Sequence, residues 1–546
     1  MSLKETLSDF TASRTKFRVI FLCALSLFLI GIPFSRFLMS LGGIVLFANW
    51  VLEGGVIEKF KRAFQSKAIW ACLLLYFVHI IWLISSQNLR YGIEDLWIKI
   101  PMFFMPIIFF TTQPLSRKEF ETLLQIYIIG VFISTFSGFM AYIFGDMNDK
   151  RDMALYISYV RFGINICFAC FVCLFLLFKT ELTSLRKVFM AILLCWLLFF
   201  MAYSGSMTAI VLLFFIGTFF VIWQTIKSTK KIFRYGIPAL FLFLVTGSSY
   251  SLYVIVKAYF DADFSIETAA KYTPGGNPYV HDTSMHYIEN GSYIYTYICD
   301  VELERAWNKK SRIDFHELDK NGFPIRTTLI RYLNSKGLHK DSQGVVVLTQ
   351  EDISNIEQGI ANVSYTYNFN IINRIYELMW EMSDYYNTGM VTGYSMVQRF
   401  ELWKNSIELI KKYPYVGVGT GDVKDAFAEE LASNNSPLAG TNMRSHNQYF
   451  TFLIAFGFIG LLLILFSFIY PPIVLRKNHL LFWIFFFIVL LSMFTEDTLE
   501  PQDGATFFAF FYSFFLFLAP QKRRYEAESS ARSSVVSLQS MKPKEH

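Results

Sequence analysis

Long uninterrupted apolar stretches are the feature that most constrains this 546-residue chain. A helix needs about 20 apolar residues to cross the hydrocarbon core of a bilayer, and only helices and closed barrels satisfy every backbone group there. Twelve stretches approach that length. They are residues 17–34, 37–52, 68–85, 98–112, 123–144, 161–178, 188–203, 207–226, 235–256, 449–470, 480–494 and 506–519. We therefore predict an all-α polytopic membrane protein with about twelve transmembrane helices.

The composition agrees with a chain that lies largely in lipid. Hydrophobic residues make up 54% of it and charged residues only 17%, whereas about 25% is usual for the charged residues of soluble domains. The net charge of +6 is small for this length, and no basic block resembles a nucleic-acid patch. These values argue against a soluble enzyme, a fibrous protein and a disordered chain. We expect membrane lipids, and no nucleic acid, as partners.

Lysine and arginine are distributed unevenly between the short connections of the predicted spans. If the N-terminus is cytoplasmic, the connections and ends on that side carry all but four of the cations in these segments. The four outer cations are Arg36, Arg90, Lys150 and Arg151. Because cytoplasmic loops carry an excess of Lys and Arg, we predict that both termini are cytoplasmic.

One connection is far longer than the others. Residues 257–448, between the ninth and tenth predicted spans, hold polar and charged residues at ordinary density, and a connection of this length is either functional or disordered. Its aromatic residues and apolar periodicity predict a folded, mainly helical domain on the outer face. The remaining divisions are residues 1–256 with nine spans, residues 449–519 with three spans, and residues 520–546 as a disordered cytoplasmic tail.

The seven cysteines indicate neither a disulfide framework nor a metal centre. Only Cys299 falls in residues 257–448, so packing must hold the fold of this segment. Cys167, Cys170 and Cys173 have a spacing that invites a metal interpretation, but their helix is apolar and offers no obvious fourth ligand. Cysteine is common as a small apolar residue in such a setting. We therefore expect no metal site and no cofactor.

A cation at the edge of a span needs an explanation, because charge beside lipid is costly. Arg161 opens the sixth predicted span at the outer face. Its side chain either extends to the interface to reach water or binds an anion in a cavity. On the same face, an uncharged turn that contains Ser204 and Ser206 joins the seventh and eighth spans. These serines either line a polar pocket or simply form the turn.

Residues 395–421 predict a helix followed by a glycine-rich turn. Ser395 to Gln398 fit a capping box at the start of the helix. One apolar face then recurs at Phe400, Trp403, Ile407 and Ile410. Such a helix suits the headgroup region of a membrane. Pro414 ends it, and the turn at 417–421 lacks the lysine of a phosphate-binding loop, although a backbone nest for an anion stays open.

Two polar segments border the last three predicted spans on the outer face. His446, which lies between Arg444 and Asn447 at the mouth of the tenth span, is either part of a helix cap or a proton-transfer group. The turn before the last span carries carboxylates at Glu496, Asp497 and Glu500. These carboxylates either bind substrate hydroxyls or end two helices in water.

The order of these features resembles the O-antigen ligase and O-antigen polymerase superfamily. The resembling pattern is an arginine, a tryptophan, a proline, a Gly-x-Gly turn and a His-Asn pair before a span, followed by two glycines within that span. It is formed here by Arg399, Trp403, Pro414, residues 417–419, His446, Asn447, Gly457 and Gly460. The close match covers residues 399–460, and the segments around Arg161, 204–208 and 496–502 extend it loosely. Residues 260–390 match no motif of the family.

Members of this superfamily are membrane glycosyltransferases of the GT-C type. They act at the periplasmic face of the bacterial inner membrane on a glycan carried by undecaprenyl diphosphate, and the ligases transfer it to lipid A-core with inversion and without a metal ion. The resemblance implies that Arg161 and Arg399 clamp the donor diphosphate, a task that suits the bidentate guanidinium. It also implies that His446 accepts the proton of the acceptor hydroxyl. Further substrate contacts are expected from Arg444, Asn447, Ser204, Ser206, Trp403 and Glu496.

The leading interpretation is an O-antigen ligase, because a large folded outer segment suits an enzyme that must hold a separate, bulky acceptor. A polymerase or an O-linked oligosaccharyltransferase would use the same polyprenyl-diphosphate donor, so the motif residues do not separate them from a ligase. A transporter of polyprenyl-linked glycans would need paired inverted repeats and helices broken near the membrane midplane. We see no convincing internal repeat, and Arg161, Arg399 and His446 fall at one predicted face of the membrane.

Overall fold

The computed structural model describes residues 3–145, 147, 150–179, 182–226, 231–284, 286–366 and 371–520. These residues are mostly helical, in agreement with the predicted all-α class, and they form two units. The first unit joins residues 1–217 to residues 402–546, and the second comprises residues 218–401. Nearly all of the predicted tail at 520–546 lies outside the described residues.

The first unit is built from helices that come before and after the second unit in the sequence. Before it come α1 (Leu3–Phe34), α2 (Arg36–Leu52), α3 (Val56–Phe64), α4 (Lys67–Leu83), α5 (Leu89–Lys99), α6 (Pro101–Thr111), α7 (Arg117–Phe144), a 3₁₀ turn at Lys150–Met153, α8 (Tyr159–Lys179), α9 (Ser184–Ser204) and α10 (Met207–Ile226). After it come α17 (Ser395–Lys412), α18 (Val423–Ser433), α19 (Gln448–Val474), α20 (Leu480–Ser492), α21 (Gln502–Ser513) and a π-helical turn at Phe514–Leu518. Both α10 and α17 cross the boundary between the units.

Several helices of the described chain are suited to a bilayer. Six are long and apolar enough to cross it: Thr15–Phe34, Arg117–Phe144, Tyr159–Phe178, Ser184–Ser204, Arg234–Phe260 and Gln448–Val474. The pair α2 and α3 forms a seventh if one span contains a bend of 105°. Shorter apolar helices occupy Lys67–Leu83, Met207–Ile222, Leu480–Ser492 and Gln502–Leu518. The helices support a polytopic membrane protein, and a total of twelve spans stays a prediction.

The predicted span at 98–112 is interrupted in the structure. α5 ends at Lys99, and α6 begins at Pro101, whose fixed φ and missing N–H suit a first helical position. α6 has only 11 residues, too few to cross the hydrocarbon core. It packs instead against α4 and α21. Lys99 consequently lies inside the first unit, with 1% of its side chain exposed.

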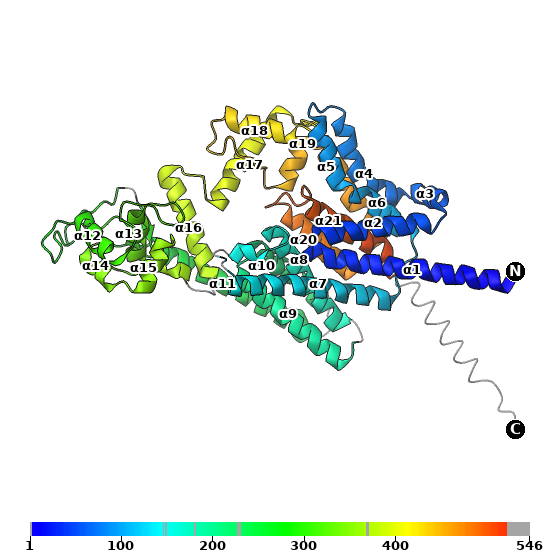
Figure 1. Cartoon of the computed structure of the whole chain (residues 1–546), viewed down its shortest axis with the longest axis horizontal. Helices are drawn as coiled ribbons and strands as arrows, with labels where there is room; N and C mark the ends of the chain where they lie inside the picture. Colours follow the sequence, from blue (N-terminus) through cyan, green and yellow to red (C-terminus); the bar gives the residue numbers. More distant parts are fainter. Residues whose placement is uncertain are drawn as a thin grey trace, which may run out of the picture. The chain divides into compact units, whose positions relative to one another are not determined.

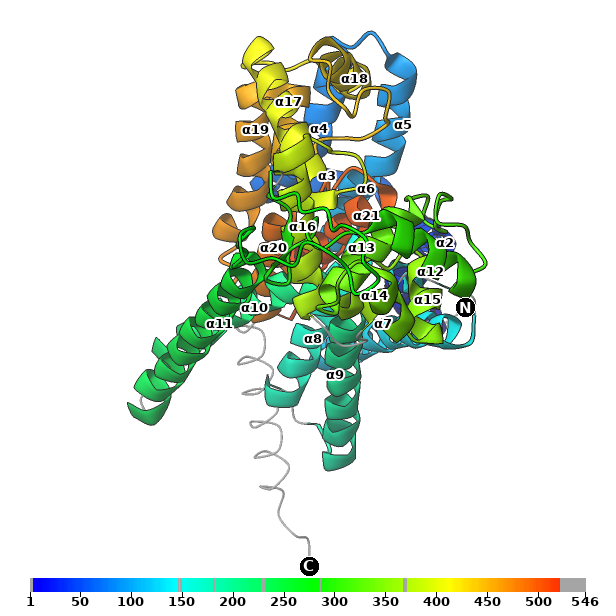
Figure 2. The same ribbon diagram turned by 90° about the vertical axis from the view of Figure 1, so that its left-hand side faces the viewer.

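Aromatic side chains fill the interior of the first unit. Phe168 of α8 meets the edges or faces of Phe485, Phe507, Phe511 and Phe515 on α20 and α21 and in the turn that follows. Helices in lipid gain little from the hydrophobic effect, so their association depends on close contacts of this kind. Elsewhere in the unit, α1 lies beside α7 (Figure 1) and α4 beside α19 (Figure 2). The many phenylalanines therefore hold the helices to one another as well as facing lipid.

Arg161 and His446 can be assigned to one end of the helices of the first unit. α8 begins at one end, close to Arg161, and α19 begins at the same end, close to His446. α20 ends there and α21 starts there. At the opposite end, where the turn after α21 finishes, the Leu115 amide donates a hydrogen bond to Leu518 O at 2.9 Å. Arg161 and His446 consequently lie at the same end of the helices.

The second unit contains most of the predicted outer segment, residues 257–448, whereas residues 402–448 belong to the first unit. Its elements are a π-helical turn at Ile232–Gly236, α11 (Ile237–Phe260), the antiparallel strands β1 (Ile288–Glu289) and β2 (Ser292–Tyr293), α12 (Asp300–Lys310), α13 (Ile325–Ser335), α14 (Ser342–Val347), α15 (Gln350–Glu357), a 3₁₀ turn at Val363–Thr366 and α16 (Ile371–Thr388). Arg331 is buried, donates two hydrogen bonds to Glu289 at 2.9 and 3.0 Å and stacks on Trp380. Hydrophobic packing and this buried ion pair hold the unit together.

Candidate active site

The glycine-rich turn of the motif packs against a kink in α19. At Gly457 the backbone leaves the helical region, with φ 61° and ψ −168°. The amides of Phe458 and Ile459 therefore donate to the oxygens of Pro414 and Tyr415, instead of to helical carbonyl groups. Glycine tolerates this positive φ without a steric penalty. Gly457 and the segment that leads into the glycine-rich turn thus have a structural function in this chain.

The carbonyl groups released by the kink accept hydrogen bonds from the turn. Val418 N donates to Ile454 O at 2.8 Å, and Gly419 N donates to Ala455 O at 2.9 Å. Because these two amides already have acceptors, they are not available to an anion. The interpretation of the turn as an anion-binding backbone nest is therefore wrong.

Asn447 and Gln448 form the start of α19. The Asn447 side chain accepts hydrogen bonds from Tyr449 N at 3.0 Å and Phe450 N at 3.2 Å, which makes it a helix cap. Gln448 Nε2 donates to Glu500 Oε1 at 2.7 Å. These contacts close the helix end and tie it to the turn between α20 and α21.

His446 lies just before this cap in a backbone conformation that is uncommon for residues other than glycine. Its φ is 49°, and its amide donates to Asp497 Oδ2 at 3.0 Å. Nδ1 of the imidazole lies 3.5 Å from Glu496 Oε2, and the side chain is 38% exposed. Since Nδ1 itself is buried, the exposure belongs to the rest of the ring. The imidazole therefore turns one nitrogen toward a carboxylate and leaves another part accessible.

Asp497 connects His446 to Arg161. Its carboxylate accepts a hydrogen bond from Thr451 Oγ1 at 2.6 Å in addition to the one from the His446 amide, and its backbone oxygen accepts one from Arg161 Nη2 at 2.8 Å. Burial raises the pKa of the Asp497 carboxyl above its usual value, and the hydrogen bond from Thr451 opposes this shift. A single buried residue thus contacts the backbone of His446 and the guanidinium of Arg161.

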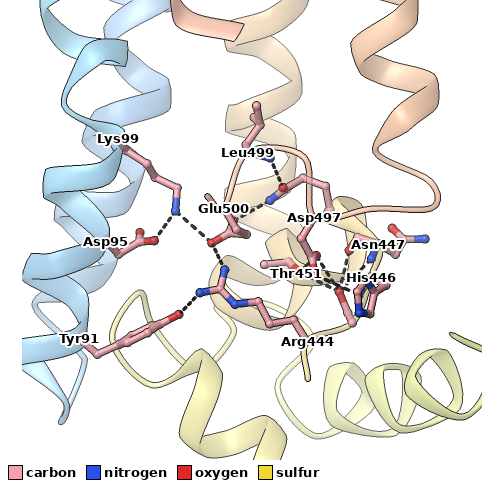
Figure 3. Close-up of polar contacts among 12 residues, drawn as sticks. Tyr91, Asp95, Lys99, Arg444, His446, Asn447, Thr451, Asp497, Leu499 and Glu500 are labelled. Carbon is pink, nitrogen blue, oxygen red and sulfur yellow. Dashed lines mark hydrogen bonds and ion pairs between the residues drawn. The ribbon is translucent and has the colours of Figure 1, made fainter. Parts of the chain in front are cut away.

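A second polar cluster surrounds Glu500. Figure 3 shows Glu500 between two cations, with Oε2 3.1 Å from Lys99 Nζ and 3.2 Å from Arg444 Nη1. Arg444 Nη2 also donates to Tyr91 OH at 2.8 Å, and Lys99 also pairs with Asp95. Burial alone would raise the pKa of Glu500, but Lys99 and Arg444 outweigh it and lower this pKa to about 2. The cluster is a set of mutually compensating charges, of which Lys99, Asp95 and Glu500 are buried and Arg444 is partly exposed.

Arg161 does not extend outward to reach water. Nη1 donates to Ser158 Oγ at 2.9 Å, Nη2 donates to Asp497 O, and Nε lies 4.0 Å from Asp503 Oδ1. Its side chain is largely buried. The structure therefore holds the guanidinium among the ends of α8, α20 and α21, and the interpretation as an arginine that snorkels to the interface does not fit.

Ser204 and Ser206 belong to a tightly packed turn near the start of α8. Tyr159 OH donates to Ser204 O at 2.7 Å, and Ser204 Oγ bonds Met201 O within its own helix. Ser206 is buried against Gly163. A Cβ added at Gly163 would collide with the hydroxyl oxygen of Ser206. These contacts account for the turn, and any contact of the two serines with substrate stays a prediction.

The predicted helix after residue 394 is present as α17, which begins at Ser395. Arg399 lies near its start, in the second unit, with Nη1 3.4 Å from Ser395 O. Trp403 lies in the first unit, where its ring meets Phe450 edge to face at 6.3 Å. Of the three residues that the resemblance assigns to catalysis, the structure therefore links two, Arg161 and His446.

Of three residues that shape the site, Gln448 and Lys99 were absent from the predicted set, and Asp497 was predicted only as one of the carboxylates in its turn. Asp497 and Gln448 organise the start of α19, and Lys99 compensates Glu500. A signal for Lys99 was present, because Asp95 and Lys99 stand four residues apart beside an apolar run, the spacing of a helical ion pair.

The fold and the polar cluster define a polytopic helical membrane protein that ties a histidine and an arginine to one buried aspartate at one end of its helices. Residues 359–465 match a family model described as O-Antigen ligase. This match confirms the resemblance to the O-antigen ligase superfamily, whose domain the chain carries, and supports a general role as an enzyme that transfers or polymerises glycans. A comparison with curated proteins finds no match.

Proposed function

We propose that this protein is an O-antigen ligase. It transfers a glycan from undecaprenyl diphosphate to the lipid A-core oligosaccharide at the periplasmic face of the bacterial inner membrane, without a metal ion and with inversion at the anomeric carbon. The observation that carries the proposal is the double use of Asp497, whose carboxylate holds the His446 amide and whose carbonyl oxygen holds the Arg161 guanidinium. The proposed base and the proposed cation are thereby tied to the same buried residue.

His446 is the general base in this mechanism. Because Nδ1 faces Glu496, Nε2 is the nitrogen that accepts the proton of the acceptor hydroxyl. As the acceptor oxygen bonds to the anomeric carbon, the bond from that carbon to the phosphate oxygen breaks, and its electron pair leaves with the diphosphate. Glu496 stabilises the imidazolium that forms. We therefore propose a positioning role for Glu496 in place of the expected contact with substrate.

Arg161 and Arg399 act on the leaving group. The diphosphate gains negative charge as the glycosidic bond breaks, and cationic donors that are already in place stabilise this charge most effectively. Arg161 is fixed by Ser158 and Asp497, and its Nε has no hydrogen-bond acceptor among the residues that the structure describes. The family motif supplies Arg399 as the second cation. Both guanidinium groups suit phosphate oxygens better than lysine would.

The other residues that are predicted to contact substrate differ in the hydrogen bonds that they already make within the protein. Arg444 pairs with Glu500 and Tyr91, and Asn447 caps α19. We propose that these two residues position the site. Ser204, Ser206 and Trp403 stay candidates for contact with the glycan or with lipid.

The membrane orientation completes the proposal. The end that holds Arg161 and His446 faces the periplasm, both termini are cytoplasmic, and residues 257–448 lie on the periplasmic side. A ligase must hold a separate, bulky lipopolysaccharide acceptor, and a large extramembrane segment favours this activity over a polymerase.

The proposal is tested by transfer with purified full-length protein in detergent. Lipid-linked donor and lipid A-core are supplied with a chelator and without nucleotide, and the expected product is glycan on the core. His446→Ala and Arg399→Ala should strongly lower the rate of transfer, whereas substitution of an exposed histidine of the second unit, His316→Ala, should preserve it. Loss of transfer on chelation, or full activity in His446→Ala, contradicts the mechanism.

The same experiment separates a ligase from a polymerase. Lengthening of the donor glycan in the absence of lipid A-core would identify a polymerase. In cells without the gene, a ligase defect leaves uncapped core and accumulates lipid-linked glycan, whereas a polymerase defect leaves single repeat units on the core.

A further inference from the structure

Three helix starts of the first unit meet at the carboxylate of Asp503. Asp503 is the second residue of α21, Arg36 is the first residue of α2, and Arg161 is the third residue of α8. The Asp503 oxygens lie 3.8 Å from Arg36 Nη2 and 4.0 Å from Arg161 Nε. Gln502 Nε2 donates to Ser40 Oγ at 3.1 Å and joins the starts of α21 and α2. The three charged side chains therefore form one constellation.

Asp503 is buried without hydrogen-bond donors. Its side chain is 3% exposed, and neither oxygen accepts a hydrogen bond from any residue within the described ranges. Both arginine contacts are longer than hydrogen bonds, and Arg161 Nε likewise has no acceptor there. An ionised carboxylate accepts several hydrogen bonds, and a buried one without them is energetically unfavourable. The Asp503 oxygens can therefore accept hydrogen bonds from the hydroxyl groups of a ligand, and Arg161 Nε can donate one.

Arg36 is the exposed member of this constellation, whereas the Asp503 oxygens are buried. Arg36 is 55% exposed and borders an open groove of about 430 Å³ that is also lined by Ser35 and residues 154–157. Two guanidinium groups against one carboxylate leave an excess of positive charge, and three helix N-termini add to it. The charge therefore favours an anion beside Arg36, and the buried, unpartnered oxygens of Asp503 next to it favour hydroxyl donors.

A ligand that combines both features is a glycosyl phosphate. We propose that Arg36, Arg161 and Asp503 form the subsite for the sugar that is attached to the diphosphate of the donor, an assignment that rests on the proposed function. Asp503 accepts hydrogen bonds from hydroxyl groups of this sugar, and Arg36 binds a phosphate oxygen. The subsite adds recognition of the donor sugar to the phosphate contact of Arg161.

Binding of two lipids separates this role from structural support. Purified full-length protein in detergent is titrated with glycosylated polyprenyl diphosphate and with the same lipid without sugar. Asp503→Asn should weaken binding of the glycosylated lipid by about tenfold or more and leave the sugar-free lipid nearly unaffected, because only the sugar donates to Asp503. Arg36→Ala should weaken both lipids. Arg90→Ala, at an exposed arginine that pairs with Glu94, should change neither.

The control for damage to the start of α21 is Gln502→Ala, which should bind both lipids as the wild type does. An equal loss of affinity for both lipids in Asp503→Asn, or no loss of affinity for either, overturns the proposed subsite. Weaker binding of lipid A-core in place of the donor overturns the assignment to the donor. A donor whose first sugar lacks hydroxyl groups must also bind the wild type more weakly, and this measurement does not depend on a variant that folds. If sugar-dependent binding through Asp503 is present but no glycan is transferred, the proposed function fails and the subsite stands.

Discussion

The clusters around Asp497 and Glu500 lie three residues apart in one turn, yet they are organised differently. Asp497 accepts hydrogen bonds from a hydroxyl and an amide, and the imidazole of His446 beside it keeps an accessible part. Glu500 lies between Lys99 and Arg444 and is compensated by both. Figure 3 shows the two arrangements next to each other. The difference teaches that neighbouring carboxylates of one turn can be satisfied in two ways, one by neutral hydrogen-bond donors and the other by two cations.

The largest effect is expected from His446→Ala. Removal of a positioned general base should lower the transfer rate by about 10²–10⁴-fold. The backbone amide that bonds Asp497 remains, so the unfolding temperature should change little. The check is an initial rate at saturating donor and acceptor, together with thermal unfolding in detergent. A wild-type rate in a normally folded His446→Ala variant would assign the general base to another residue. The cluster around Asp497 would then have no proposed chemical role that distinguishes it from the cluster around Glu500.

Glu500→Ala tests the structural role of the cluster around Glu500. Lys99 and Arg444 would be left without their shared anion, and the loss of one partner of a buried ion pair costs about 3–5 kcal/mol. The expected result is a lower unfolding temperature and less folded protein, with a smaller change in transfer rate per folded molecule than in His446→Ala. A stable but inactive variant would show that Glu500 takes part in the reaction.

The two carboxylates should also respond to acid in opposite directions. The pKa of Glu500 is lowered from 4.5 to about 2, so its contribution to the free energy of unfolding is present above pH 4.5 and is lost as pH falls toward 2. The pKa of Asp497 is raised, so its protonation in acid does not remove stability. Thermal unfolding between these pH values should show a fall in the wild type and a flatter profile in Glu500→Gln. An equally steep fall in that variant would contradict the assignment.

A smaller effect is expected from Asp497→Asn. The substitution weakens the hydrogen bonds to the His446 amide and Thr451 and should cost about 1–3 kcal/mol of stability. The carbonyl oxygen that holds Arg161 remains, so donor binding should change less than the rate of transfer. Thr451→Val removes one of these bonds and is the matched control with the milder loss. Equal loss of donor affinity and rate would indicate that the turn has moved as a whole.

The smallest effect is expected from Glu496→Gln. Loss of the charge 3.5 Å from His446 Nδ1 weakens the stabilisation of the imidazolium and should lower kcat by about tenfold with little change in KM. Separate measurement of kcat and KM for donor and acceptor is the check. A rise in the KM of the acceptor alone would instead favour the contact with sugar hydroxyls that the sequence suggests for Glu496.

The helices and two members of the site could be predicted because their signals are local. Apolar runs identify membrane-length helices wherever they pack, and a capping pattern places the start of α17 at Ser395. Arg161 and His446 attract attention because each is a polar group at the border of an apolar run. Such features depend on neighbours in the sequence, so no knowledge of the fold is needed to find them.

Other parts of the site could not be predicted because their partners are distant in the sequence. Lys99 and Glu500 are 401 residues apart, so their charges appear unrelated until α5 meets the turn before α21. The kink at Gly457 is likewise intelligible only when the turn at 417–421 lies against it, because the turn supplies the donors and acceptors that the kinked helix lacks.

The sequence by itself determined a helical membrane protein, its resemblance to the O-antigen ligase superfamily and the presence of unusual cations and a histidine at helix ends. Only the tertiary structure decided which of these groups lie together. Arg161 and His446 both bond Asp497, Arg444 compensates Glu500, and Asp503 lies near two arginines without a hydrogen-bond donor among the residues that the structure describes. The physical reason is that apolarity is a property of each segment, whereas hydrogen bonds and compensated charges are properties of pairs that only the folded chain brings within reach.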